Sequence, residues 1–334
     1  MITKNNVKNK IILKLYLCFI LYFYIFPINN NIIFFFSTKK NKIKANLVIP
    51  TIYKDFHKVY RNFKYLKEYI DCIDKLILIG DKEIEKKIGN ESYFNISFQF
   101  INEINIINIT KVINLIKQKN KNAIKRSGWY IQQFIKMEYS RMCRDKYYLV
   151  WDSDTIPIKN ISIFDKENKP YFDVMDKYSK SYFTTLKKIF PELGKIYIYS
   201  FVTEHMLIKT EIMRKLINKI KLNKSLKGDT WYEKVINCID RKDLPGLGFS
   251  EFETYGTFAF IYYFNSYNIR FWKSLRKGNQ FLDPNLLNYN ILKRFSNEYD
   301  AISFEKWDIK KHIKHMKKKK KNNVMVKIYL VKFK

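Results

Sequence analysis

Short apolar runs and helix-period stretches alternate along the middle of this chain. Residues 46–52 (NLVIPTI) and 75–80 (KLILIG) each have the length and composition of a buried strand. Between them, residues 54–70 carry apolar side chains at three- and four-residue steps, which predicts an amphipathic helix. This strand–helix–strand order predicts a parallel α/β sheet, with a ligand crevice at the carboxyl ends of its strands.

The same alternation continues toward the C-terminus. Residues 128–143 have helical periodicity, and 147–151 (YYLVW) form an apolar run that leads directly into Asp152-Ser153-Asp154. Further predicted elements are a strand over 94–100, a helix over 110–119, one or two strands over 197–209, helices over 211–220 and 231–239, and a loop followed by a helix over 248–263.

A separate hydrophobic segment lies near the N-terminus. Residues 15–26 carry no charge, and apolar residues resume at 32–36. The first run fits a signal-peptide core in length, whereas the whole stretch would span a bilayer only by burying three Asn and Pro27. No small-residue cleavage site follows, which favours an uncleaved signal anchor, with a buried N-terminal helix as the alternative. Lysines on both sides leave its orientation open.

Charge divides the chain into three parts. The 334 residues include 63 Lys and Arg against 31 Asp and Glu, a net charge of +32. Residues 1–45 hold eight Lys and residues 310–334 hold eleven, and neither flank contains an acid. We therefore predict a basic N-terminus with the hydrophobic segment (1–45), a catalytic domain (46–309) and a Lys-rich tail (310–334). The 47% hydrophobic content excludes an intrinsically disordered chain.

The Asp152-Ser153-Asp154 triplet carries the clearest chemistry. Two carboxylates separated by one residue can direct oxygens at one hard cation such as Mg²⁺ or Mn²⁺. In sugar transfer from a nucleotide donor, such an ion neutralises the charge that grows on the departing diphosphate. The alternative is a solvated turn whose acids only cap the next segment.

Four motifs together resemble a known enzyme family. GWYIQQFIKM (128–137), YYLVWDSDTIP (147–157), FVTEHMLIK (201–209) and GFSEFETYG (248–256) occur in the order found in GT-A-type glycosyltransferases with a DXD motif. The resemblance covers about residues 45–305 and is closest to a group of largely unassigned substrate. It implies one GT-A-like, Rossmann-like α/β domain with a mostly parallel central sheet flanked by helices.

The resemblance also implies roles for the residues at the strand ends. Asp152 and Asp154 match the pair that binds metal (Mn²⁺ or Mg²⁺) and the nucleotide-sugar donor. Ser153 is expected to contact the donor ribose or a metal-bound water. Thr51 and Asp81 follow the first two strands and are similar in place to positions that hold the nucleotide.

Further candidates lie on neighbouring segments. Gln132 and Gln133 are adjacent on one helix and cannot share a face, so one reaches the donor, preferably Gln133, while the other packs or caps. Arg126 either offsets diphosphate charge or is an ordinary surface arginine. His205 is either a third metal ligand, since a neutral imidazole suits Mn²⁺, or a hydrogen-bonded structural histidine.

Glu251 and Glu253 are the candidates for a catalytic base. An inverting enzyme needs a carboxylate that removes the acceptor hydroxyl proton. Ser250 and Glu253 also have the spacing of a helix capping box, which leaves Glu251 as the better base candidate. A retaining enzyme needs no such base, and the sequence leaves the stereochemistry open.

Three functions are compatible with these features. The leading hypothesis is a metal-dependent glycosyltransferase that acts on a glycan, lipid or protein acceptor. It would be membrane-associated through an N-terminal single-pass anchor, in a secretory compartment such as the Golgi or ER if the source is eukaryotic or viral. The alternatives are a metal-dependent nuclease or nucleic-acid-binding protein that uses the basic flanks, and an inactive interaction protein. Nucleic acid is the less favoured partner, because the flanks lie far in sequence from the Asp pair.

Overall fold

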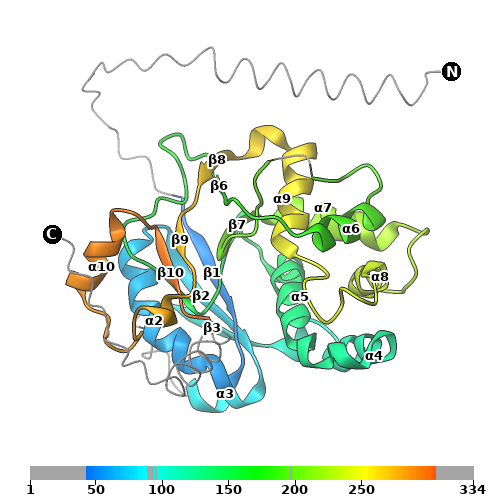
Figure 1. Ribbon diagram of the computed structural model, residues 1–334, viewed down its shortest axis with the longest axis horizontal. Coiled ribbons are helices and arrows are strands. Elements are labelled where there is room, and N and C mark those ends of the chain that lie inside the picture. The colour runs from blue at the N-terminus through cyan, green and yellow to red at the C-terminus, as the bar shows by residue number, and fades with distance from the viewer. Residues whose placement is uncertain (1–42, 89–93, 95, 196–197, 306–334) are drawn as a thin grey trace, which may run out of the picture. The chain divides into compact units, whose positions relative to one another are not determined.

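The computed structural model describes residues 43–88, 94, 96–195 and 198–305. Their centre is a five-stranded sheet with the order β3-β2-β1-β4-β7 (Figure 1). Its strands are β1 (Ala45–Pro50), β2 (Ile73–Gly80), β3 (Phe98–Asn102), β4 (Tyr147–Trp151) and β7 (His205–Lys209). All neighbours are parallel except β7, which pairs antiparallel with β4. The predicted α/β class with a mostly parallel, helix-flanked sheet is therefore confirmed.

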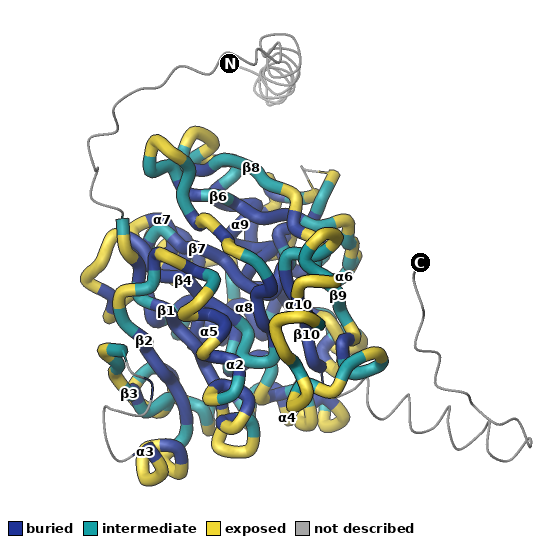
Figure 2. The backbone as a smooth tube through the Cα atoms, turned by 90° about the vertical axis from the view of Figure 1, so that its left-hand side faces the viewer, coloured by how far each residue is buried: buried dark blue, intermediate teal, exposed yellow. Residues whose placement is uncertain are grey.

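Both faces of the sheet are covered, as the continuous apolar strands predict. In β1, Leu47 and Val48 are fully buried but belong to different core clusters, because successive side chains of a strand point to opposite faces. Leu149 and Val150 of β4 likewise belong to different core clusters. In Figure 2 these central strands run through the molecule as buried backbone.

Helices on the two faces come from successive parts of the chain, α2 and α3 before β3 and the others after it. The first face is covered by α2 (Phe56–Tyr69) and α3 (Lys82–Ile88), whose apolar residues join the cluster of Leu47. The opposite face is larger and is covered by six helices (Figure 1). These are α4 (Ile109–Lys119), α5 (Ser127–Met142), α6 (Lys180–Ile189), α7 (Thr210–Leu222), α8 (Trp231–Cys238) and α9 (Glu251–Tyr262).

Several short elements were not predicted. A three-stranded sheet joins β5 (Thr155–Pro157), β10 (Ala301–Ser303) and β9 (Ser274–Leu275). A second pair joins β6 (Tyr171–Val174) to β8 (Asn268–Phe271), and α10 (Tyr289–Ser296) precedes β10. Strands of two to four residues are too short to show a periodicity. Of the predicted strand region 197–209, only β7 is a strand, and upstream Ser200 forms a single bridge with Met175.

The strand order predicts where a ligand crevice lies. From β1 the chain winds through β2 to β3 on one side, and β4 lies on the other side of β1. Such a reversal opens a ligand crevice at the carboxyl ends of the two central strands. Thr51 follows β1 and Asp152 follows β4, so these two predicted positions flank the reversal.

The predicted membrane segment, residues 15–36, lies outside the described residues, as does the Lys-rich tail. Among the helices that the structure describes, none is both long enough and apolar enough to cross a bilayer.

Candidate active site

The turn after β4 is held through its backbone. The Asp152 amide donates to the Glu204 carbonyl at 2.8 Å, and the Asn62 side chain of α2 donates to the Ser153 carbonyl at 2.8 Å. The Phe304 amide donates to the Asp154 carbonyl at 2.8 Å. The Asp152 side chain remains 38% exposed. The chain therefore fixes the turn while one of its carboxylates still reaches solvent.

Lys136 of α5 links the turn to α9. Its buried ammonium lies 2.7 Å from Asp152 Oδ1 and 2.8 Å from Glu251 Oε1. Burial alone would lower the pKa of Lys136, but the two carboxylates outweigh it and raise the pKa above its usual range. Burial raises the pKa of Glu251, and Lys136 opposes that rise. The sequence interpretation missed Lys136, although a lysine among the apolar residues of its helix was a visible signal.

Asp154 is the second carboxylate of the turn and is half-buried. Burial and then the charge of Asp152 raise the pKa of Asp154 to about 6. A carboxylate whose pKa is raised by a neighbouring negative charge fits a site for a hard cation, which would relieve that repulsion. Across the described ranges, no group of three or more His, Cys, Asp and Glu side chains is arranged to hold a metal. An ion here would therefore take further ligands from donor phosphates and water, as Mg²⁺ commonly does.

Two cations that the sequence interpretation also missed pair with Glu204, whose backbone carbonyl accepts from the Asp152 amide. Arg276 Nη1 is 3.3 Å and Lys177 Nζ is 3.8 Å from Oε1 of Glu204, whose carboxylate is buried. The Trp272 indole donates to Oε2 of Glu204 at 2.8 Å, and Arg276 also pairs with Glu305. Burial lowers the pKa of Lys177 to about 8, which leaves it mostly charged at neutral pH. Both cations lie in segments without regular secondary structure, where the sequence shows neither a helix period nor a strand period.

His205 belongs to a buried cluster of polar side chains. Its Nε2 is 2.8 Å from Asp173 Oδ2, and its ring stacks on Trp151 with centroids 4.5 Å apart. Burial would raise the pKa of Asp173, but hydrogen bonds from Arg270 and His205 outweigh it and lower the pKa to about 2. This arrangement matches the structural alternative for His205, and its role as a metal ligand stays a prediction.

The two glutamines of α5 have different surroundings. Gln133 is buried, and its Oε1 accepts from the Glu251 amide at 3.1 Å. Its side-chain nitrogen donates to the Trp129 carbonyl at 3.3 Å. Gln133 thus caps the first turn of α9, while Gln132 is half-buried. Both bonds are made within the protein, so a contact between Gln133 and the donor stays a prediction.

The remaining donor candidates are engaged with the protein itself. Thr51 is buried at the end of β1. The Asp81 carboxylate accepts from the Tyr53 amide at 2.8 Å and from the Ile84 amide at 3.2 Å. The Arg126 guanidinium lies 4.1 Å from the Trp129 ring centroid and donates to the Gly246 carbonyl. Their contacts with a nucleotide remain predictions.

Glu253 is buried and is bonded to the hydroxyl groups of Ser200 and Thr257 rather than to the charged groups of the turn. Its amide donates to the Ser250 hydroxyl at 3.2 Å, which is the capping bond that the spacing predicted. The Ser200 hydroxyl donates to the Glu253 carboxylate. Burial raises the pKa of Glu253 to about 7.

Comparison with known proteins places the chain in a family. A protein-family model described as a family of unknown function (DUF6492) matches residues 42–318, which is most of the chain. The chain belongs to the DUF6492 family. No curated protein matches the sequence of this DUF6492 member.

Solved structures similar to the DUF6492 chain include three glycosyltransferases. Apo GlyE of Streptococcus pneumoniae TIGR4 is 11% identical with a TM-score of 0.37, covering 79% of this chain and 55% of GlyE. Apo mouse xyloside xylosyltransferase 1 is 11% identical with a TM-score of 0.40, and the match covers 78% of this chain and 97% of the xylosyltransferase. The galactosyltransferase LgtC, solved with donor and acceptor sugar analogs, is 10% identical with a TM-score of 0.35, and the match covers 78% of this chain and 87% of LgtC. The DUF6492 chain thus spans about half of GlyE, and such low scores assign it no activity.

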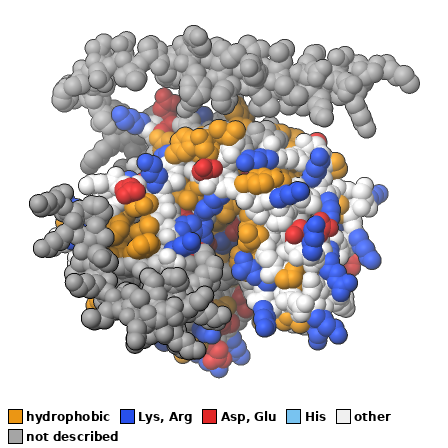
Figure 3. All heavy atoms as spheres, in the orientation of Figure 1, with side chains coloured by type: hydrophobic (Ala, Val, Ile, Leu, Met, Phe, Trp, Pro, Cys, Tyr) orange, Lys and Arg blue, Asp and Glu red, His pale blue; other side chains and the backbone are white. Residues whose placement is uncertain are grey.

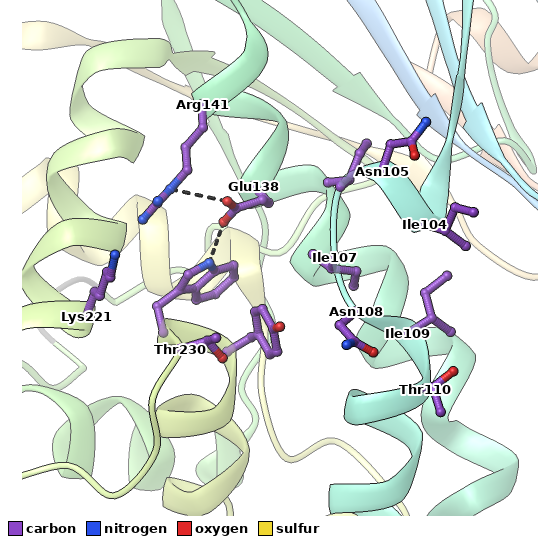
Figure 4. Close-up of a pocket in the computed structure, with 13 residues that line it drawn as sticks. Ile104, Asn105, Ile107, Asn108, Ile109, Thr110, Glu138, Arg141, Lys221 and Thr230 are labelled. Carbon is purple, nitrogen blue, oxygen red and sulfur yellow. Dashed lines mark hydrogen bonds and ion pairs between the residues drawn. The ribbon is translucent and has the colours of Figure 1, made fainter.

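A separate hollow of about 480 Å³ lies between α4, α5, α7 and α8 of the DUF6492 protein (Figure 4). Glu138 and Arg141 point toward each other in it, 3.3 Å apart, and the Trp231 indole donates to Glu138. No predicted site residue lines this hollow. The hollow is therefore separate from the candidate active site.

Replacing Glu253 with glutamine is expected to change how stability depends on pH. A carboxyl group whose pKa rises on folding stabilises the fold fully below its unfolded pKa and loses that contribution as pH rises through about 7. The E253Q variant has no carboxyl group to titrate at this position. The difference between its unfolding free energy and that of the unmodified protein should therefore rise by up to about 1.4 kcal/mol per pH unit between pH 5 and 7. Urea unfolding across this range measures it. A constant difference would contradict the buried, protonated state of Glu253.

Proposed function

We propose that this DUF6492 protein is a metal-dependent glycosyltransferase that uses a nucleotide-sugar donor and a hydroxyl acceptor. The observation that carries the proposal is the meeting of four charged side chains at the β1–β4 reversal. Asp152 and Asp154 supply carboxylates, and Lys177 and Arg276, which pair with Glu204, supply cations within electrostatic reach of this turn. Such a mixture suits a ligand that combines a diphosphate with a divalent cation.

The cations are proposed to bind the donor diphosphate. Arg276 presents a planar fork of N–H donors that matches phosphate oxygens, and it is 31% exposed. Lys177 is 29% exposed and adds a point charge. Their present partner, Glu204, is buried at 2% exposure, so it holds both cations in place without filling the crevice.

Asp152 and Asp154 are the residues that would hold Mn²⁺ or Mg²⁺. When bound, that ion supplies charge neutralisation for the departing diphosphate. The chain itself positions the carboxylates, Asp154 through the backbone of the turn and Asp152 also through Lys136.

Glu251 is proposed to position Asp152 rather than to act on the acceptor. Its side chain is 6% exposed and shares the ammonium of Lys136 with Asp152. A carboxylate so buried and paired is poorly placed to take a proton from a sugar hydroxyl. Its predicted role as general base is untested.

Binding of UDP, GDP and CDP, each with and without Mn²⁺ or Mg²⁺, tests the proposal. One nucleotide is expected to raise the melting temperature only with metal, since ligand at a hundred times its Kd adds about 2.7 kcal/mol of stability. Arg276→Met should remove most of that rise. Arg141→Met, a cation of the separate hollow, is the matched control and should retain it.

The alternative function predicts the opposite pattern. A nuclease or nucleic-acid-binding protein would bind duplex tightly and in a salt-sensitive way, with no metal-dependent response to any nucleotide diphosphate. Such a result would contradict sugar transfer. On the face shown in Figure 3, Lys and Arg side chains are scattered rather than gathered into a stripe, which is less typical of a nucleic-acid surface.

A further inference from the structure

Three large apolar side chains are exposed within one short segment. Phe281, Leu286 and Tyr289 have exposed fractions of 66%, 69% and 64%. The intervening Leu282 and Leu287 are partly buried and pack against the small core beneath β10. Leu282 and Leu287 thus attach the segment to the fold, while its other large apolar side chains face solvent.

This segment lies beside the candidate active site. The Asn279 side chain donates to the Glu305 carbonyl at 3.0 Å, and Arg61 of α2 donates to Asn285 at 3.4 Å. The residue before Glu305, Phe304, donates its amide to the Asp154 carbonyl. The exposed apolar side chains therefore belong to an edge that is connected directly to the Asp152–Asp154 turn.

Positive charge surrounds the same edge. Lys277, Lys293 and Arg294 are exposed, against one exposed acid within the segment, Asp283. The chain continues from Glu305 toward residues 310–334, which hold eleven Lys and no acid. In the sequence these lysines begin five residues after Glu305, whose carbonyl accepts from Asn279 of this edge.

We propose that this edge, residues 277–294, binds an anionic lipid surface. Apolar side chains that enter the headgroup region and nearby cations that attract anionic lipids together give stable, salt-sensitive attachment. The proposal depends neither on sugar transfer nor on the hydrophobic N-terminal segment. Its consequence is that the Asp152–Asp154 turn would lie close to the membrane surface.

A fluorescent probe on Leu286 tests this contact in the full chain. L286C is labelled with NBD in a C18S background, since the other three cysteines are buried. Vesicles contain phosphatidylcholine with or without phosphatidylserine, and nitroxide lipids serve as quenchers. The matched control is a probe on Leu222, which is 75% exposed at the end of α7, on the other side of the molecule from α10 (Figure 1).

The Leu286 probe is expected to shift to the blue and to be quenched severalfold more than the Leu222 probe when phosphatidylserine is present. Equal quenching of the two probes would overturn the proposal, even if the N-terminal segment holds the protein on the vesicle.

A second variant tests the electrostatic part. Replacing Lys277, Lys293 and Arg294 with Gln is expected to reduce quenching of the Leu286 probe severalfold, as should high salt. Quenching that responds to neither change, and is equal without phosphatidylserine, would overturn an anionic lipid as the ligand.

Discussion

Replacing Asp152 or Asp154 with asparagine is expected to lower sugar transfer at least about 100-fold while the protein remains folded. Asparagine keeps the shape of aspartate but removes the negative charge that a divalent cation requires. The backbone hydrogen bonds of the turn stay in place in both variants, and only D152N also changes a side-chain ion pair, the one with Lys136. The measurement is metal-dependent hydrolysis of a nucleotide-sugar panel, followed by transfer with whichever donor is active.

The two variants are expected to differ in stability, which gives an internal check. D154N removes a carboxylate whose pKa is raised by burial, so it should cost nothing or add stability. D152N removes one of two partners of the buried Lys136 and should be the less stable variant. Asp229, 93% exposed, provides the control substitution D229N, with transfer unchanged. Full transfer by D152N or D154N would contradict their role in binding metal and donor.

Lys136→Met is expected to have the largest effect on stability, a loss of about 3 kcal/mol in unfolding free energy. It leaves the buried Glu251 carboxylate without its cation, next to the negative charge of Asp152. The value lies at the lower end for a broken buried pair, because Asp152 is 38% exposed and keeps part of its hydration. Transfer should also fail, since Asp152 loses the group that positions it.

Lys234→Met is the matched control, because Lys234 is also buried but donates only to the carbonyls of Lys221 and Asn223. It should leave transfer intact. Adding Glu251→Gln to Lys136→Met should restore part of the lost stability by removing the uncompensated charge, without restoring transfer. A change of less than about 0.5 kcal/mol for Lys136→Met, the range of ordinary surface substitutions, would contradict the importance of the bridge.

The main strands and helices of this protein can be predicted from local patterns in its sequence. Buried strands appear as continuous apolar runs and helices as three- and four-residue periods, and both signals are local. For that reason β1, β2, β4, α2 and α5 were predicted close to their observed bounds. The position of Asp152-Ser153-Asp154 at a strand end followed from the same local pattern.

Tertiary structure alone decided which side chains meet around that triplet. Lys136, Lys177 and Arg276 come from three segments widely separated along the chain, and no local period relates them. The direction of β7 and the pairing of His205 with Asp173 likewise depend on contacts between distant segments. Local patterns fix secondary structure, but the partners of a buried charge are fixed by packing, because a charge is stable inside a protein only where the fold brings its counter-charge.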